Sequence, residues 1–273
     1  MFTREEIITA LQEKGYDTKP VSVSKNNVTL DGIQFSVRPV APIIYTDALI
    51  KDAEAHGMTL DEVVSGIIET YEAHRAPAMD FNEIMTVQYI KDHIKIGLQR
   101  TTSEEIIKRP CALDENIEEY LYITIDMGGE GAGSAKIKPD MLDGIGMEPE
   151  TAWSYARENT FNDITVEDMS VILAAFGMGS DTAPGTPTML VISNHDRIKG
   201  AAAILDRETL EKIGKDYDTG EIIIIPSSIH ECIIIPHTEH LNIDEVTEMV
   251  MDVNKSVVDP VDQLGDRAYI VTL

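Results

Sequence analysis

The sequence predicts an α+β fold in which a mainly antiparallel sheet is covered by helices on one side. Capping-box spacings, Thr3-x-x-Glu6 and Thr59-x-x-Glu62, open amphipathic runs that are typical of helices. Short alternating apolar runs between these helices indicate half-buried strands. Two isoleucine-rich runs are separated only by Pro226–Glu231. Because a parallel crossover needs about a dozen residues or more, these two runs form an antiparallel hairpin if they pair.

The N-terminal part is expected to form an α/β lobe. Its first helix begins after Thr3, buries Ile7, Ile8 and Leu11, and ends at Gly15. The elements expected after it are strands at 21–23, 28–30 and 33–37, a helix at 59–71, a strand at 119–127, and helices at 149–159 and 169–176. Residues 90–98 fit either a strand or a helix.

The C-terminal part is expected to follow the order β-β-α-β-β-α-β. Asp206 and Asn242 are the predicted caps of its two helices. Its strands are expected at 188–192, 200–205, 222–225, 233–235 and 268–271. Gly and Pro punctuate residues 177–187, which are therefore the expected linker. The predicted lobes are 1–176 and 188–273, and the alternative is a single continuous domain.

The charge balance excludes several classes of partner. The chain of 273 residues has 22 Lys and Arg against 48 Asp and Glu, a formal net charge of -26. Clustered basic residues, which direct binding to nucleic acid or to an anionic membrane needs, are absent. No apolar run approaches the roughly 18 residues of a membrane span. The acidic N-terminal segment and only two cysteines, Cys111 and Cys232, predict a cytoplasmic protein that is not exported.

The loop between the isoleucine-rich runs is the candidate binding site. These runs lack alternation, so both faces of each strand are expected to be buried. Pro226 and Pro236 cannot donate to a ladder and are expected at strand ends. The hairpin would then present polar side chains at the rim of a rigid sheet. These candidate binding residues are Ser227, Ser228, His230 and Glu231.

The same loop suggests a hydrolase as an alternative, using Ser228, His230 and Glu231 with help from residues 194–197. On an extended strand, however, His230 and Glu231 point to opposite faces, and no G-x-S-x-G motif is present. A loop whose serine hydroxyls bind its own backbone is the commoner outcome. The catalytic residues therefore stay unknown.

Two further segments invite a metal or cofactor interpretation. His237–His240, with His230 as a third ligand, does not match the H-E-x-x-H or H-x-x-E-H spacing of zinc enzymes. Gly128–Ser134 lacks the Walker spacing, and Glu130 would repel a phosphate. We expect no metal and no cofactor, and we expect the glycine-rich segment to be a hairpin loop.

Three segments near the C-terminus resemble an uncharacterised bacterial family, a domain of unknown function that is frequent in gut Firmicutes. They are residues 188–194 (TMLVISN), 199–205 (KGAAAIL) and 223–231 (IIIPSSIHE), which are similar to the pattern LTN…GAA…L…ILPSS-hydrophobic-HE. Residues 59–98 and 156–160 match more loosely. The resemblance implies a cytoplasmic bacterial protein and supplies no reaction, ligand or catalytic residue.

The sequence thus favours a non-catalytic binding or interaction protein whose partner is an unknown protein or small molecule. The alternatives are the hydrolase and, last, an acidic protein that imitates nucleic acid. The third alternative requires carboxylates arrayed at phosphate-like spacing on one face.

Overall fold

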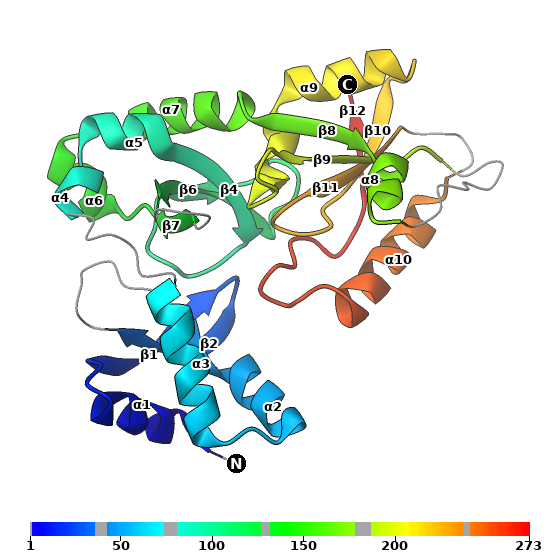
Figure 1. The fold of residues 1–273 in the computed structure, drawn as a ribbon. Helices are drawn as coiled ribbons and strands as arrows, with labels where there is room; N and C mark the ends of the chain where they lie inside the picture. Colours follow the sequence, from blue (N-terminus) through cyan, green and yellow to red (C-terminus); the bar gives the residue numbers. More distant parts are fainter. Residues whose placement is uncertain (1, 36–42, 74–80, 127–131, 178–186, 237–240) are drawn as a thin grey trace. The chain divides into compact units, whose positions relative to one another are not determined.

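The computed structural model describes residues 2–35, 43–73, 81–126, 132–177, 187–236 and 241–273 (Figure 1). Within these residues the strands form three antiparallel sheets, which confirms the predicted α+β class. The chain divides into two compact units. The first comprises Met1–Tyr89 and Thr124–Ser134, and the second comprises Ile90–Ile123 and Ala135–Leu273.

The first unit holds the sheet of order β1-β2-β3. Its elements are α1 (Arg4–Glu13), β1 (Thr18–Lys25), β2 (Val28–Phe35), β3 (Ile43–Tyr45), α2 (Thr46–His56), α3 (Leu60–Ala73) and α4 (Phe81–Ile84). The predicted capping box at Thr3 is confirmed, with the Glu6 N–H donating to Thr3 Oγ1 at 3.2 Å. The strands predicted at 28–30 and 33–37 are instead one strand, β2, because Asp31-Gly32 continues the pairing with β1.

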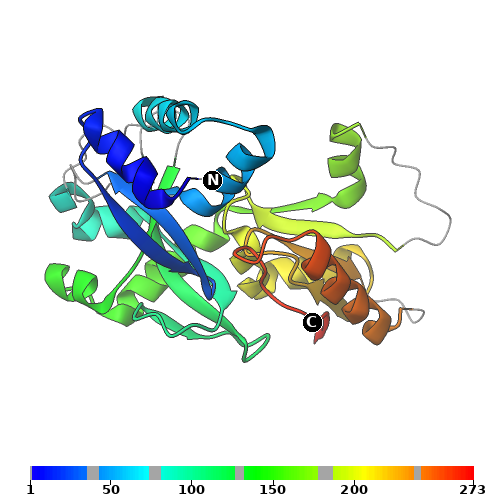
Figure 2. The same ribbon diagram turned by 90° about the horizontal axis from the view of Figure 1, so that it is seen from below.

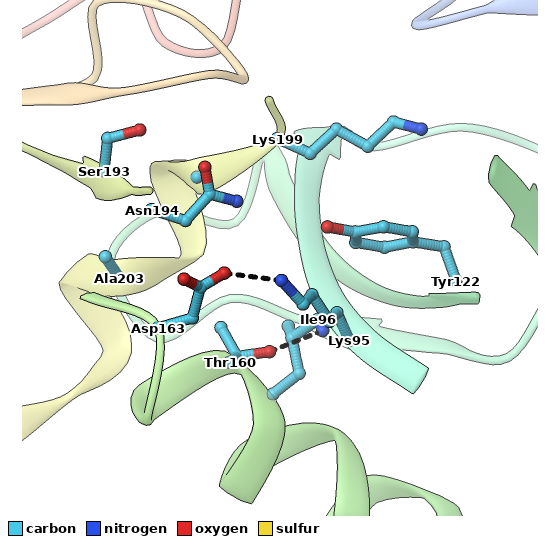
Figure 3. A pocket seen from close by; sticks show the side chains of 10 residues that line it. Lys95, Ile96, Tyr122, Thr160, Asp163, Ser193, Asn194, Lys199 and Ala203 are labelled. Atoms are coloured by element: carbon cyan, nitrogen blue, oxygen red, sulfur yellow. Dashed lines mark hydrogen bonds and ion pairs between the residues drawn. The ribbon is translucent and has the colours of Figure 1, made fainter. Parts of the chain in front are cut away.

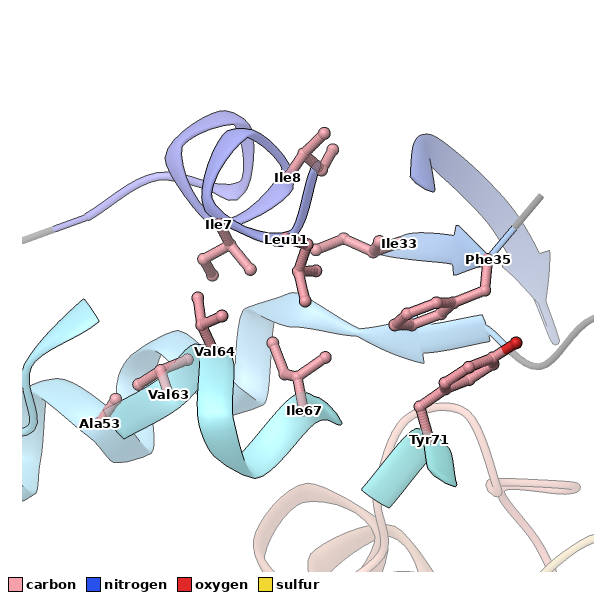
Figure 4. Close-up of a cluster of buried hydrophobic side chains, with 10 residues drawn as sticks. All are labelled: Ile7, Ile8, Leu11, Ile33, Phe35, Ala53, Val63, Val64, Ile67 and Tyr71. Carbon is pink, nitrogen blue, oxygen red and sulfur yellow. The ribbon is translucent and has the colours of Figure 1, made fainter. Parts of the chain in front are cut away.

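The core of this unit lies between the helices and the sheet (Figure 4). Ile7 and Leu11 from α1 and Val64 and Ile67 from α3 are fully buried with Ile33 of β2. At one end of the cluster the rings of Phe35 and Tyr71 stack with their centroids 3.8 Å apart. The apolar stripes predicted for both helices therefore face the sheet.

The second unit contains one sheet entirely and most of a smaller one, of which the part within Thr124–Ser134 falls in the first unit. The smaller has the order β4-β6-β5, with β7 also pairing with β6. The elements around it are α5 (Val87–His93), β4 (Ile94–Arg100), β5 (Lys108–Pro110), β6 (Ile117–Asp126), β7 (Ala132–Lys136), α6 (Pro139–Ile145) and α7 (Pro149–Phe161). The ambiguous residues 90–98 are thus the end of α5 followed by β4. Helix α7 packs against β4, where Thr160 Oγ1 accepts the Ile96 N–H at 2.9 Å.

The larger sheet has the order β12-β10-β11-β9-β8. Its strands and helices are β8 (Ile164–Asp168), α8 (Met169–Ala175), β9 (Leu190–Asn194), the 3₁₀ helix η1 (Gly200–Leu205), α9 (Arg207–Asp216), β10 (Glu221–Ile225), β11 (Cys232–Pro236), α10 (Ile243–Ser256) and β12 (Tyr269–Thr272). The predicted hairpin is confirmed, because β10 and β11 are antiparallel with Ile225 opposite Ile233. Both predicted caps are confirmed by backbone N–H groups that donate to the side chains of Asp206 and Asn242.

Helices cover both faces of this sheet, so the prediction of cover on one side was wrong. Helix α10 packs on one face through Val246, which contacts a cluster that includes Ile223 and Ile235. Helix α9 lies across the opposite face (Figures 1 and 2). The physical reason is visible in the sequence, since strands of consecutive isoleucines are apolar on both faces and need cover on both.

Residues 200–205 were predicted as a strand and form η1 instead. Alanine favours helical backbone, and the small side chains of Ala201, Ala202 and Ala203 are buried. β8, which was not predicted, adds a strand to the sheet. The predicted linker falls largely on 178–186, outside the described residues, so the division into lobes at that point stays a prediction.

Candidate functional site

The predicted loop joins β10 to β11 at the end of the sheet where β9 also ends. Ser228 is buried and holds the loop together. Its Oγ accepts the N–H groups of His230 at 3.0 Å and of Glu231 at 3.4 Å, and its own N–H donates to the Glu231 carbonyl. A serine hydroxyl used in this way stabilises a turn. Ser227 lies beside it and is half-buried.

The His230 ring bridges two other segments. Its Nδ1 accepts the backbone N–H of Lys199 at 3.1 Å. A ring nitrogen that accepts carries no proton, so the proton of the neutral ring lies on Nε2. That atom is 3.4 Å from Asp262 Oδ1. Both ring nitrogens of His230 are therefore engaged by groups other than Ser228.

The three residues of the hydrolase alternative are brought together only in part. Ser228 Oγ is 3.5 Å from Glu231 Oε1, at the outer limit of a hydrogen bond. Within the described residues, no hydrogen bond joins Ser228 Oγ to the His230 ring. Among the described residues, the long contact with Glu231 is therefore the one side-chain hydrogen bond that joins members of this trio, and it is weak for activating a serine.

The second predicted loop, residues 194–197, packs against the first. Ser193 Oγ donates to the His230 carbonyl at 2.8 Å, and the Asn194 side chain exchanges two hydrogen bonds with the Ile198 backbone. Gly200 follows. Because it has no Cβ, its backbone can lie close to Ser193 and Asn194. A Cβ there would come within 2.3 Å of Ser193 Oγ and 2.5 Å of the Asn194 nitrogen.

Gly200→Ala is accordingly expected to lower the free energy of unfolding by about 1–3 kcal/mol, because the added methyl overpacks a backbone contact. Urea denaturation measures the change. The matched control is Gly144→Ala in α6, where the space around the Cβ is open and alanine favours the helix. Equal losses in the two variants would contradict the close packing of the two loops.

A small cavity lies between the two sheets of this unit, with polar and charged side chains among its lining residues (Figure 3). Lys95 Nζ is 2.5 Å from Asp163 Oδ2, and Asp163 Oδ1 is 2.7 Å from His195 Nδ1. Burial alone would raise the pKa of Asp163, but the hydrogen bonds from Lys95 and His195 outweigh it and hold the pKa below its usual value. The cavity has a volume of about 10 Å³, roughly the space for one water molecule. It is too small for a substrate.

Tyr122 closes one side of this cavity. The ring is buried, and burial raises the pKa of its hydroxyl. Lys199 Nζ lies 4.9 Å from the ring centroid, a cation–π distance. Lys95, Tyr122, Asp163 and Asp262 were not predicted as site residues from the sequence. The contact between Lys95 and Asp163 spans 68 positions, and no local pattern signals it.

A larger groove lies on the face of the sheet that α9 covers, between α9 and the edge strand β8. Its volume is about 500 Å³, within the range of small-molecule sites. The apolar side chains that line it are Phe161, Ile164, Val166, Leu190, Ile213 and Tyr217. The polar ones are Asp168, Thr209, Lys212 and Asp216. We call this the β8–α9 groove.

Neither cysteine is poised as a nucleophile. Cys111 and Cys232 are free and buried, and burial raises the pKa of both thiols. Among the described residues no three His, Cys, Asp or Glu side chains gather as a metal site would require. The histidines His237 and His240 and residues 128–131 of the predicted hairpin loop lie outside the described residues, and residues 132–134 of that loop form the start of β7 instead. No helix in the described part of the chain combines the length and apolar character needed to cross a bilayer.

A family model described as a family of unknown function, DUF5688, matches residues 3–271. No curated protein and no solved structure matches the chain.

Proposed function

The chain belongs to the DUF5688 family of unknown function, and we propose that it is a cytoplasmic, non-catalytic binding protein whose ligand occupies the β8–α9 groove. The observation that carries the proposal is the groove itself, which has the volume of a ligand site and a lining that mixes apolar side chains with polar and charged ones. Ser228 and His230 of the predicted loop, by contrast, are engaged with nearby backbone N–H groups and with carboxylates.

Exposed apolar side chains in the groove and on the helix that follows β8 support an interaction role. Val166 and Tyr217, which line it, are 38% and 41% exposed. Helix α8 follows β8 directly, and its Val171 is 63% exposed. Figure 2 shows α8 projecting from the end of β8, and none of its residues is buried. Exposed apolar groups that cluster in this way mark sites of association.

Filling the groove tests the proposal. In a fragment screen by saturation-transfer NMR, we expect apolar fragments to bind the wild-type protein and to lose at least tenfold in affinity with Val166→Trp, because the indole occupies the groove. The matched control is Val171→Trp, an exposed position outside it, where affinity should persist. Fragments that bind both variants equally, or that bind neither variant nor the wild type, would contradict the proposed site.

The loop of Ser227, Ser228, His230 and Glu231 stays a prediction as a contact surface, and the hydrolase stays the alternative function. An activity screen with ester, phosphate and peptide substrates tests the latter. Activity that disappears with Ser228→Ala while the fold persists would replace the binding role with a catalytic one.

A further inference from the structure

We propose that the β8–α9 groove takes an extended peptide that adds a strand to the free edge of β8, with apolar residues at alternate positions and basic residues between them. This inference rests on the proposed function and names its ligand. It comes from the direction of the β8 backbone, the faces of its side chains and the charge around the groove.

β8 is the last strand of its sheet. The Met169 N–H donates to the Met189 carbonyl across the pair with β9 at 2.9 Å. In an antiparallel ladder alternate residues point toward and away from the neighbour. The N–H and C=O groups of Ile164 and Val166 therefore point away from β9, and no hydrogen bond to them is found within the described residues.

The opposite edge of the sheet is different. At β12, the Leu273 N–H donates to the Gly220 carbonyl, so the backbone of Thr272 points outward by the same alternation. Its carbonyl accepts a hydrogen bond from Arg207 Nη1 at 2.8 Å. A side chain thus blocks one edge, a common protection against strand addition, whereas β8 has no such cover among the described residues.

The side chains of β8 make the edge selective for the side chains of an added strand. Ile164 and Val166, whose backbone groups face outward, also line the groove. A strand laid beside β8 would therefore place every second side chain on the groove side, as in other peptides bound by strand addition. The five residues of β8 span about 17 Å, enough for a peptide of about five to seven residues.

Charge favours a basic peptide over a second copy of this chain. The rim carries Asp168 and Asp216 against Lys212, and Lys212 and Asp216 form no ion pair within the described residues. The whole chain has a net charge of -26, which repels another copy and attracts a cationic segment.

Labelled octapeptides test the inference by fluorescence polarisation. The probes are an alternating Lys-Val peptide, an alternating Glu-Val peptide and a scrambled Lys and Val peptide in which four lysines precede four valines. We expect the alternating Lys-Val peptide to bind at least tenfold more tightly than either of the others. Equal binding of the scrambled peptide would mean unspecific charge attraction and would overturn the inference, as would equal binding of the Glu-Val peptide.

A pair of edge variants locates the peptide. Val166→Pro removes an outward N–H without breaking the ladder to β9, and we expect at least a tenfold loss of affinity. Ile270→Pro makes the same change at the β12 edge and should leave binding unchanged, with circular dichroism confirming the fold of both. Equal losses in both variants, or none with Val166→Pro, would overturn strand addition.

Two outcomes separate this inference from the proposed function. Fragments that fill the groove while no octapeptide binds would leave the binding role standing and remove the peptide. A dimer of the free chain in analytical ultracentrifugation, with the Val166 amide protected from hydrogen exchange, would make a second copy the occupant and overturn the peptide as well.

Discussion

Glu118→Ala is expected to lower the free energy of unfolding by about 3 kcal/mol or more, because it breaks a buried ion pair from one side. Glu118 lies on β6, and its side chain is 5% exposed. Its carboxylate is 3.2 Å from Lys108 Nζ and accepts hydrogen bonds from Gln99 at 2.7 Å and Thr102 at 2.8 Å. Removing it takes the nearest acceptor from the buried Gln99 amide and from the Thr102 hydroxyl, and it leaves Lys108 without its carboxylate partner on β6.

Urea denaturation at neutral pH measures the loss. The matched control is Glu115→Ala, an exposed glutamate three positions away, where we expect a change within about 0.5 kcal/mol. A loss for Glu118→Ala no larger than that of the control would show that this network contributes nothing to stability.

Lowering the pH is expected to lower the free energy of unfolding by about 2 kcal/mol through the protonation of Asp114 alone. A shift of one unit in a pKa corresponds to about 1.4 kcal/mol. Asp114 Oδ2 accepts hydrogen bonds from Arg267 Nη2 at 2.8 Å and from the Tyr269 hydroxyl. Burial alone would raise the pKa of this carboxyl, but these bonds and that of the Asn116 N–H lower the pKa from 3.8 to about 2.

The direction in which stability changes with pH follows from proton binding. Between about pH 4 and pH 2 the unfolded chain binds a proton at Asp114 that the folded chain does not, so the stability is present above pH 4 and declines toward pH 2. Asp114→Asn should be less stable at neutral pH and should show a shallower decline in that window. Identical acid profiles for the two proteins would contradict the assignment.

Most of the fold could be predicted from the sequence, because the patterns that indicate its helices and strands are local. Thr3, Asp206 and Asn242 bind N–H groups two or three residues ahead, so the caps can be found without tertiary information. The hairpin followed from the short spacing between two isoleucine runs. Residues 200–205 were wrongly predicted as a strand, although their three consecutive alanines favour a helical backbone.

The candidate site was harder to predict. The sequence located the loop at Ser228 and His230 but not the partners that engage it, Lys199 and Asp262, which are 31 and 32 positions from His230. The β8–α9 groove was missed altogether, since the expected elements did not include β8. Its short run, ITVED, offers only two apolar residues in alternation, too few for a clear strand signal.

The most direct test of the proposed binding role is to map ligand-induced amide shifts on the ¹⁵N-labelled protein with a fragment from the screen. We predict that the perturbed amides cluster at Ile164–Asp168 and on α9 from Thr209 to Tyr217. Perturbations that cluster instead at Ser227–Glu231, with the groove unaffected, would contradict the account and return the binding site to the loop.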